Sequence, residues 1–343
     1  MKPVLAPMVR AGFVGMQRIC SVYGADTLFT DALFPQNIIN SNIFESQDIL
    51  LFIRKDIRTI FFDKSLLHKT CVQLVGSDFD TLSQSILILQ KYFTRIDLNC
   101  GCTKNFARQG GYGADLLNRP ESLISLLKQL TQTHPKIDFS VKIRYLESEE
   151  KTIQFVSDLF NTGVKYVSIH MRHINQDRET SEADFNQFYR IYEQSAFKKQ
   201  LIANGGIISL KDYEKFKKLF VEPPQVMIAS GAVRNPSVFK AICGNIDGIS
   251  EQEVHIQQVL QELMSLHVLK PQSYKQIQGD AFELSPESIA QFYFVDTKIG
   301  IAMIIQYTKK YKLDKQDVEW AKLAAPKINN AKNMNDIIQI INE

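Results

Sequence analysis

Short apolar runs alternate with longer amphipathic segments from residue 4 to about residue 243. Runs this short are typical of buried strands, and most of the segments between them have room for one helix. The pattern predicts eight strands, at residues 4–7, 27–30, 70–74, 94–98, 139–143, 166–170, 201–204 and 225–229. Strands that alternate with helices pair in parallel through right-handed crossovers. Eight such units predict an α/β fold that closes into a (β/α)8 barrel, or TIM barrel.

Two segments depart from this alternation. Residues 34–69 form an insertion after the second strand, and its apolar runs predict a hairpin on the rim of the barrel, at 50–55 and 57–62. From residue 246 onward only helical patterns follow, at 251–269, 285–295, 298–311 and 335–342. We therefore predict a barrel domain over residues 1–245 and a small all-helical domain over residues 246–343.

Composition and charge limit the function further. The 40 basic and 37 acidic residues give a net charge of only +3, so any surface for RNA must be a local patch. Five cysteines at irregular positions do not form a disulfide framework, and they suit a reducing compartment. We see no secretory signal, and no apolar run approaches the roughly 18 residues of a membrane helix. We expect a soluble monomer that is not bound to membranes, in the cytoplasm or also in the nucleus.

Polar chemistry is concentrated where the fourth strand ends. Asn99 is followed by Cys100, Gly101 and Cys102, then by a basic loop and by Gly-Gly-Tyr-Gly at 110–113. Active sites of α/β proteins lie at such strand ends. Cys100 adjoins the apolar strand and is interpreted as a small buried side chain, whereas Cys102 lies in a polar loop. A thiol of ordinary pKa is mostly protonated at neutral pH, so Cys102 could serve as a proton donor or as a nucleophile.

Metal chemistry is not predicted at this loop. The Cys-x-Cys pair supplies too few ligands for a zinc ion, and no nearby histidine completes the set.

The loop from Asn99 to Cys102, together with the Gly-Gly-Tyr-Gly segment, resembles the catalytic loop of the tRNA-dihydrouridine synthases. These are flavin enzymes that reduce specific uridines in tRNA. Six further segments follow in the order of that family: Leu-Ala-Pro-Met-Val-Arg at 5–10, Val-Gln-Leu at 72–74, Val-Lys-Ile-Arg at 141–144, Ile-His-Met-Arg at 169–172, Ile-Ala-Asn-Gly-Gly at 202–206 and Met-Ile-Ala-Ser-Gly at 227–231. The resemblance covers roughly the first 240 residues. It is closest to the eukaryotic branch that modifies position 20 of tRNA.

This resemblance implies FMN as the cofactor, NADPH or NADH as its reductant, and tRNA as the substrate. It also implies that Cys102 protonates the uracil ring on the face opposite the flavin. Lys142 shares one face of its strand with Ser140 and Arg144, and an ammonium inside a barrel is costly without a partner. Reduced flavin would be that partner. The simpler interpretation is a lysine at the end of a strand that reaches solvent.

The remaining roles also come from the resemblance. Glycines after the seventh and eighth strands let backbone amides approach a phosphate. The implied FMN contacts are Pro7, Met8 and Gln73 beside the ring, His170 on the flavin, and Asn204, Gly205, Gly206, Ser230 and Gly231 near the phosphate. The implied substrate contacts are Asn99, Lys104, Arg144 and Arg172. Candidate surfaces for RNA are Lys104 with Arg108, and a tail cluster of Lys298, Tyr307, Lys309, Lys310, Tyr311, Lys312 and Lys315.

Three positions depart from the family pattern. Thr103 stands where a proline is usual, Met171 where a glycine is usual, and Ser230 where an arginine is common. We expect Met171 to narrow the space over the site and Ser230 to weaken the hold on phosphate. Two alternatives therefore stay open: an FMN barrel oxidoreductase that acts on a free pyrimidine-like small molecule, and a catalytically weakened protein that only binds tRNA.

Overall fold

The computed structural model describes residues 1–342 except 10, 55–59, 105–106, 108, 177–179, 249–252, 266–296, 299, 307–308 and 311–314. The chain forms two compact units, and each is assembled from three separate stretches. The first unit contains Met1–Pro7, Asp26–Asn40 and His68–Ala229, and the second contains Met8–Ala25, Ser41–Leu67 and Ser230–Glu343. The boundary after residue 245 stays a prediction.

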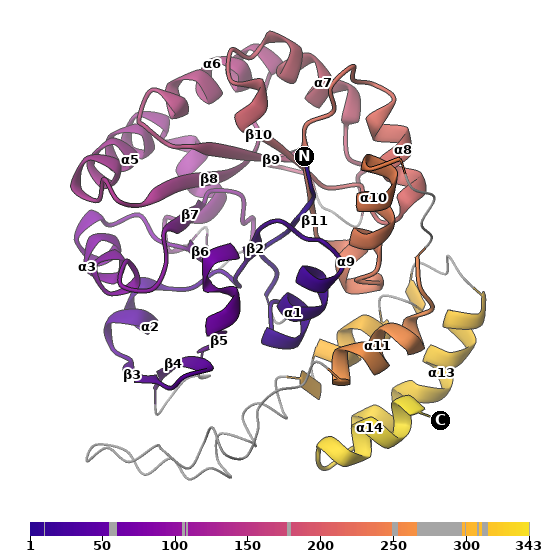
Figure 1. The fold of residues 1–343 in the computed structure, drawn as a ribbon. Coiled ribbons are helices and arrows are strands. Elements are labelled where there is room, and N and C mark those ends of the chain that lie inside the picture. Colours follow the sequence, from indigo (N-terminus) through magenta and orange to yellow (C-terminus); the bar gives the residue numbers. More distant parts are fainter. Residues whose placement is uncertain are drawn as a thin grey trace. The chain divides into compact units, whose positions relative to one another are not determined.

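The first unit is a closed barrel of parallel strands in the order β1-β11-β10-β9-β8-β7-β6-β2 (Figure 1). Its strands are β1 (Val4–Leu5), β2 (Leu28–Phe29), β6 (Thr70–Leu74), β7 (Arg95–Asn99), β8 (Asp138–Tyr145), β9 (Tyr166–His173), β10 (Leu201–Asn204) and β11 (Gln225–Ile228). The predicted (β/α)8 fold is confirmed. β8 and β9 run past their predicted ends, to Tyr145 and His173.

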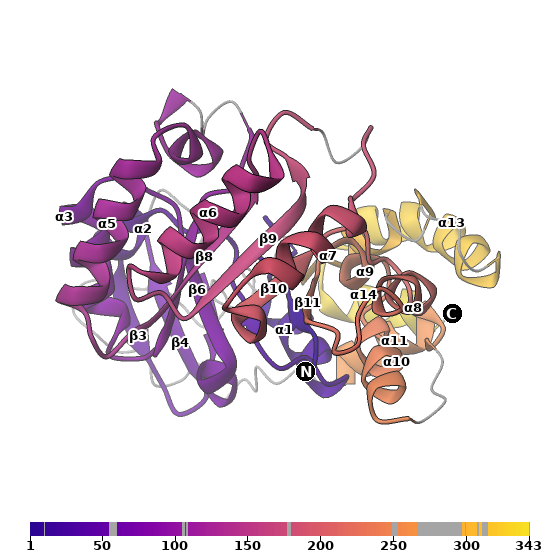
Figure 2. The same ribbon diagram turned by 90° about the horizontal axis from the view of Figure 1, so that it is seen from above.

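Helices cover the outside of this barrel, and Figure 2 shows α5, α6 and α7 along the outer side of β8 and β9. The helices of the unit are α2 (Pro35–Ile39), α3 (Phe79–Leu89), α5 (Pro120–Thr133), α6 (Glu149–Phe160), α7 (Phe185–Gln194) and α8 (Leu210–Lys217), with short 3-10 turns at η2 (Gly113–Asn118) and η3 (Lys198–Gln200). Polar side chains start several of them: Asp78, Ser148 and Asp184 each accept a hydrogen bond from a backbone amide of the first turn. On α5 the buried leucines 123, 126, 127 and 130 form one stripe.

The strands β7, β8 and β9 alternate between an apolar outer face and a polar inner face. On β7, Ile96 and Leu98 alternate with Asp97 and Asn99, and Asp97 bonds Ser140 of the neighbouring strand inside the barrel. These three strands therefore carry polar side chains along the interior and at their carboxyl ends, where an active site of this fold is expected.

The second unit combines helices with a small antiparallel sheet of order β3-β4-β5. The strands are β3 (Asn42–Glu45), β4 (Ile49–Ile53) and β5 (Ile60–Asp63), and the helices include α1 (Val14–Val22), α9 (Ser230–Arg234), α10 (Val238–Ile246), α11 (Ile256–Ser265), α13 (Lys315–Asn330) and α14 (Met334–Asn342), with the 3-10 turn η1 (Lys64–Lys69) after β5. The predicted hairpin corresponds to β4 and β5, which pair antiparallel. β3 was not predicted, because most of its side chains are exposed and give no apolar run.

The predicted tail helices are present where the structure describes them. The pattern at 251–269 corresponds to α11 and that at 335–342 to α14, residues 300–306 of the third are helical, and the segment 285–295 lies outside the described residues. Sequence analysis missed α13, whose buried face is made by Ala321, Ala324 and Ile328 and which has Pro326 inside it. Small buried residues and a proline give a weak helical signal.

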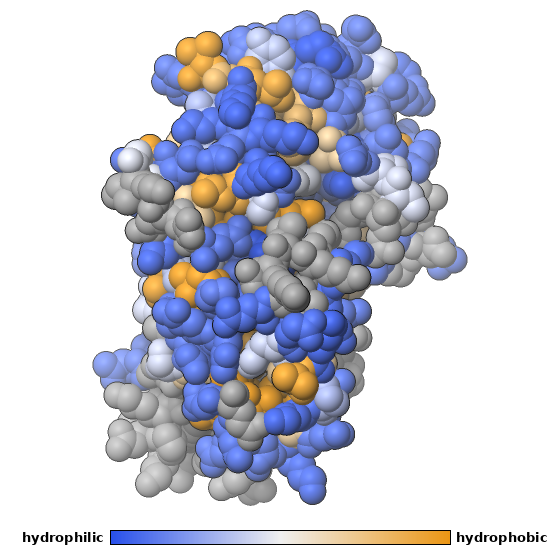
Figure 3. Space-filling view, turned by 90° about the vertical axis from the view of Figure 1, so that its right-hand side faces the viewer, coloured by the Kyte–Doolittle hydropathy of each residue, from blue (hydrophilic) through white to orange (hydrophobic). Residues whose placement is uncertain are grey.

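The described surface and helices show how hydrophobic residues are distributed in the molecule. On the face drawn in Figure 3 the described residues are mostly hydrophilic, and hydrophobic residues lie between them in separate small groups. Among the described residues, no helix combines the length and the apolar character needed to cross a membrane.

We expect Gly300→Ala to destabilise the second unit by about 1 to 3 kcal/mol, because an added methyl group would overpack a buried ring. A Cβ at Gly300 would overlap the ring of Phe13, which is itself buried. Alanine normally stabilises a helix relative to glycine, so a loss here isolates the steric effect. Thermal unfolding measures it, with Gly76→Ala as control, where the nearest atoms lie an ordinary 3.5 Å away. Equal melting of the two variants would contradict this packing.

Candidate active site

The loop that carries Cys102 is held from both sides by backbone hydrogen bonds. The amides of Gly101 and Cys102 donate to Oδ1 of Asn99 at 3.2 and 3.1 Å, and the amide of Ala114 donates to the carbonyl of Cys102 at 2.9 Å. Gly113 has φ +65°, and a Cβ there would lie 2.8 Å from the Cys102 carbonyl oxygen. The half-buried thiol is thus placed at the end of β7 by contacts that do not involve its sulfur.

A chain of side-chain hydrogen bonds runs from Asn99 into the barrel. Asn99 Nδ2 donates to Gln73 Oε1 at 2.7 Å, and Gln73 Nε2 donates to Asp97 Oδ2 at 2.7 Å. Ser140 Oγ donates to the other carboxylate oxygen of Asp97 at 2.6 Å. Gln73 and Asp97 are fully buried. We call Asp97, Gln73 and Asn99 the buried relay.

The direction of the buried relay is set by Asp97. An ionised carboxylate only accepts hydrogen bonds, so Gln73 must turn its NH2 group toward Asp97 and its carbonyl toward Asn99. Asn99 must then turn its own carbonyl toward the amides of Gly101 and Cys102. Burial raises the pKa of Asp97 to about 6, although the hydrogen bonds from Ser140 and Gln73 oppose that rise. Asp97 is therefore mostly ionised at neutral pH and holds the loop in this one arrangement.

Lys142 is the register partner of Asn99 on the neighbouring strand β8. Within the described part of the chain its ammonium makes no hydrogen bond and no ion pair. Burial, with help from the nearby charge of Arg144, lowers the pKa of Lys142 to about 8, while Asp97 and Cys102 act in the opposite direction. A half-buried cation without a protein partner is the feature here that points most directly to an anionic ligand.

The guanidinium of Arg144 binds backbone carbonyls of the Cys102 loop and of the segment after β9, and it is not exposed at the surface. It is buried, its Nε donates to the carbonyl of Gly101 at 2.9 Å, and its Nη1 donates to the carbonyls of His173 and Gln176 at 3.1 and 2.9 Å. Sequence analysis expected a substrate contact here, and the structure shows a tether between the Cys102 loop and the end of β9. The role at the substrate stays a prediction.

His170 and Arg172 form a pair at the end of β9. Arg172 Nη1 lies 3.0 Å from His170 Nε2, and Arg172 Nε donates to the carbonyl of Ser181 at 2.8 Å. A guanidinium only donates, so His170 Nε2 accepts and its proton lies on Nδ1 in a neutral ring. Met171, between them, is fully buried, in a part of β9 where the pairing with β8 shifts register. The expectation that Met171 narrows the space over the site stays a prediction.

The Asn204-Gly205-Gly206 turn follows β10 directly. Asn204 Nδ2 donates to the carbonyl of Met227 at 2.9 Å, which ties β10 to β11. Gly205 and Gly206 have φ +108° and +76°, and a Cβ on Gly205 would lie 2.8 Å from the His170 ring. Only glycine suits that place, because the backbone conformation and the neighbouring ring leave no room for a Cβ.

The structure leaves other predicted residues apart or undescribed. Pro7 ends the first stretch of the barrel unit, whereas Met8, Ser230 and Gly231 belong to the second unit, so their contacts with FMN stay predictions. Lys104 is exposed, and half-buried Thr103 lies between it and Cys102. In the tail, Lys298 donates to the Ala331 carbonyl at 2.6 Å, and Lys309 and Lys310 are exposed. The other predicted RNA contacts lie outside the described part of the structure, namely Arg108 of the loop and, in the tail, Tyr307, Tyr311, Lys312 and the side chain of Lys315.

Sequence analysis missed the residues that support the loop. Asp97 and Ser140 were not singled out as site residues. Neither was Thr30, whose Oγ1 accepts a hydrogen bond from the backbone N–H of Gln73 at 3.0 Å. The available signal was the polar alternation along β7, at Arg95, Asp97 and Asn99.

Among the described residues, no three His, Cys, Asp or Glu side chains gather as a metal site.

Comparison with known proteins gives the family of this chain. Residues 4–279 match the dihydrouridine synthase family. The chain is 30% identical over 234 residues to a tRNA-dihydrouridine synthase-like protein of Caenorhabditis elegans, covering 68% of this chain and 76% of that one. It is 28% identical to a mouse tRNA-dihydrouridine(20a/20b) synthase-like protein, over 69% of this chain and 68% of that one, and 30% identical to the Saccharomyces cerevisiae tRNA-dihydrouridine(20) synthase, over 69% and 66%. The chain belongs to the dihydrouridine synthase family.

Proposed function

We propose that this protein is a tRNA-dihydrouridine synthase that reduces one uridine of the tRNA D-loop to 5,6-dihydrouridine, with a hydride from reduced FMN and a proton from Cys102. The observation that carries the proposal is the placement of the Cys102 thiol and the unpaired Lys142 ammonium on neighbouring strand ends of the barrel. The chain's likeness to enzymes named for positions 20 and 20a/20b supports the eukaryotic branch as the nearest one.

The residues at the carboxyl end of the barrel fit a flat anionic cofactor such as FMN. Lys142 offers an ammonium that makes no hydrogen bond and no ion pair among the described residues, and the Gly205-Gly206 turn offers its backbone amides at the end of β10, next to His170 and Arg172. The neutral ring of His170 lies against Gly205, between these two features. We assign Lys142 and His170 to the ring of FMN and the Asn204-Gly205-Gly206 turn to its phosphate.

The protein supplies position, charge and a proton for the reaction. FMN, when bound and reduced, supplies the hydride that no side chain can donate. Cys102 then gives its proton to the neighbouring ring carbon and becomes a thiolate. The backbone of Lys142 pairs with the Asn99–Cys100 segment that leads into Cys102, so its ammonium would stabilise that thiolate. The buried relay keeps the sulfur in place during the transfer.

We expect Lys142→Met to lose FMN or to slow its reduction, because the variant removes an ammonium that makes no hydrogen bond or ion pair among the described residues and that we assign to the reduced ring. The affinity for FMN and the rate of flavin bleaching by NADPH under anaerobic conditions measure this. Lys128→Met, an exposed position on α5, is the matched control. Unchanged flavin content together with an unchanged rate of reduction would contradict the assignment.

The cofactor itself is tested by purifying the protein and identifying the released flavin by chromatography, followed by anaerobic titration with NADPH and with NADH. The proposal expects FMN, reduced by one of these nucleotides. A colourless protein that takes up no FMN would favour the binding-only alternative. Bound flavin that turns over free pyrimidines but not tRNA would favour the small-molecule oxidoreductase.

Phosphate contacts of tRNA are assigned to the exposed Lys104 and to the tail lysines, in particular Lys309 and Lys310. A target uridine also has to leave its stack to reach a flavin inside the barrel. Binding through phosphates should weaken steeply as the salt concentration rises. The monomeric state and the cytoplasmic or nuclear location stay predictions.

A further inference from the structure

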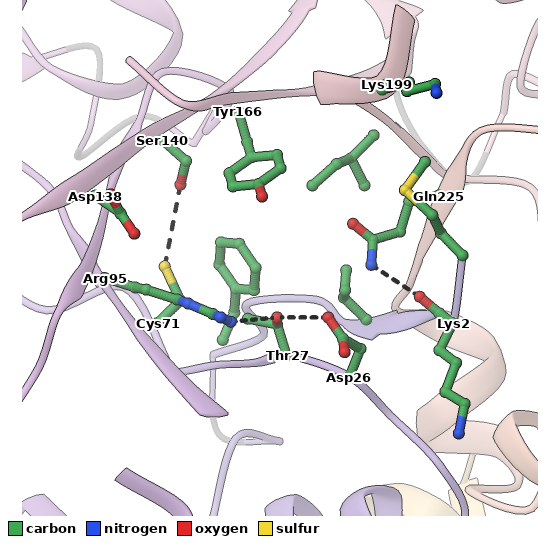
Figure 4. Close-up of a pocket in the computed structure, with 14 residues that line it drawn as sticks. Lys2, Asp26, Thr27, Cys71, Arg95, Asp138, Ser140, Tyr166, Lys199 and Gln225 are labelled. Carbon is green, nitrogen blue, oxygen red and sulfur yellow. Dashed lines mark hydrogen bonds between the residues drawn. The ribbon is translucent and has the colours of Figure 1, made fainter. Parts of the chain in front are cut away.

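A cavity of about 360 Å³ opens at the other mouth of the barrel, where the strands begin. Its walls include the first residues of four strands, Arg95 of β7, Asp138 of β8, Tyr166 of β9 and Gln225 of β11 (Figure 4). Since all strands of the barrel are parallel, this mouth lies at the opposite ends of the strands from the Cys102 loop. None of the residues assigned to FMN or to tRNA lines it.

Arg95 carries into this cavity a charge that forms no ion pair with the described residues. It is half-buried, and its guanidinium reaches across the cavity to Thr27, where Nη1 donates to Oγ1 at 2.9 Å (Figure 4). That is its only hydrogen bond in the described part of the chain, and it has no ion pair there. A guanidinium has five N–H donors in a planar fork that matches a carboxylate with two parallel bonds. Among the described residues, only Thr27 accepts a hydrogen bond from this fork.

The rest of the cavity is suited to a flat apolar group. Val4, Phe29 and Ile202 are buried in its wall, and the ring of Tyr166, which is 42% exposed, stands at its edge. The charged side chains that line it are three cations and two carboxylates, namely Lys2, Arg95, Lys199, Asp26 and Asp138, and the first residue, Met1, lines it as well. The positive groups outnumber the carboxylates, which favours an anionic ligand.

We propose that the amino-terminal mouth of the barrel binds a small organic monoanion, with its carboxylate on Arg95 and a flat apolar body against Phe29 and Tyr166. Pockets of this kind, mostly apolar with one placed charge, take ligands of this class. The site goes beyond uridine reduction, because none of the residues assigned to FMN or to tRNA lines it, and Ser140, which does line it, is connected to the proposed reaction only through Asp97.

Calorimetric titration of the full chain with naphthalene-2-carboxylate tests the proposal, with the neutral 2-naphthalenemethanol as the paired probe. The carboxylate should bind the wild type at least about tenfold more tightly than the alcohol, because only it makes charge-assisted bonds. Arg95→Gln should remove that preference and leave the alcohol unaffected, whereas Tyr166→Ala should weaken both probes. Arg190→Gln, which removes an exposed guanidinium paired with Glu149, should change neither.

The same titration separates this site from the FMN site. Lys142→Met should bind the carboxylate as the wild type does, and saturating carboxylate should leave the flavin absorbance unchanged. Equal binding of the two probes to the wild type would overturn the proposal without any variant. Loss of carboxylate binding in Lys142→Met rather than in Arg95→Gln would also overturn it, because the ligand would then lie at the opposite end of the barrel.

Discussion

Cys102→Ala should lower the rate of dihydrouridine formation by at least about 100-fold, the ordinary contribution of a general acid. The variant removes only the sulfur. The hydrogen bonds that place this residue are made by its backbone: its N–H donates to Asn99, and its carbonyl accepts from the N–H of Ala114. Alanine therefore keeps the loop in place. FMN content and flavin reduction by NADPH should therefore stay at the wild-type level. The measurement is single-turnover reduction of unmodified tRNA by the reduced enzyme.

Cys100→Ala is the matched control for that variant. Cys100 is two residues away, fully buried, and burial raises the pKa of its thiol well above the ordinary value. Its loss should cost some stability but leave uridine reduction within a few-fold of the wild type. An active Cys102→Ala, or equal losses in both variants, would contradict the assignment of Cys102 as the acid.

Asp97→Asn should lower uridine reduction by about 10- to 100-fold, although Asp97 touches neither the Cys102 loop nor the space above it. An asparagine can present either its oxygen or its NH2 group to Gln73, so the direction of the buried relay is no longer fixed. Asn99 could then turn its NH2 group toward the amides of Gly101 and Cys102, which would repel it. Asp97 is thus a positioning residue. Flavin content should not change.

The pH profile separates this role from a loss of folding. Because the pKa of Asp97 is raised to about 6, uridine reduction by the wild type should fall as the pH drops through about 6 and the carboxylate is protonated. Asp97→Asn should lack that limb. Ser140→Ala removes a hydrogen bond that lowers the pKa of Asp97, so it should move the limb to higher pH. A limb near pH 6 that persists in Asp97→Asn would assign it to another group.

Stability should respond to Asp97 in the opposite direction. A carboxyl whose pKa is raised on folding binds more protons in the folded state between its unfolded value and about 6. Its contribution to the free energy of unfolding is therefore greatest at low pH and is lost as the pH rises through about 6. Activity and this part of the stability thus have opposite pH dependences, which is typical of a charge kept buried for function.

Sequence analysis singled out the residues to which we assign direct roles and missed those to which we assign supporting roles. Cys102, Lys142 and His170 stand out because their side-chain chemistry is unusual at the end of an apolar strand. Asp97 and Ser140 lie in the middle of strands, and their importance depends on the register that places Gln73 opposite Asp97. Neighbours on different strands are not visible in a single sequence. The same limit applies to Arg144, whose contacts are carbonyls of two other segments.

For the fold as well, the elements with a strong local sequence signal were predicted and the others were not. Apolar runs placed all eight barrel strands, because strands buried on both faces leave a strong local signal. β3 and α13 lack that signal, since one is mostly exposed and the other packs through alanines. The assembly of the second unit from three distant stretches could not be predicted either, because it depends on contacts such as that of Phe13 with Gly300.

The central claim is tested most directly by incubating the purified protein with NADPH and unmodified tRNA and mapping the product nucleotides by mass spectrometry. The account predicts a gain of two hydrogens at a single D-loop uridine, present with the wild type and absent with Cys102→Ala. No gain in tRNA by an enzyme whose FMN is bound and reducible would contradict it.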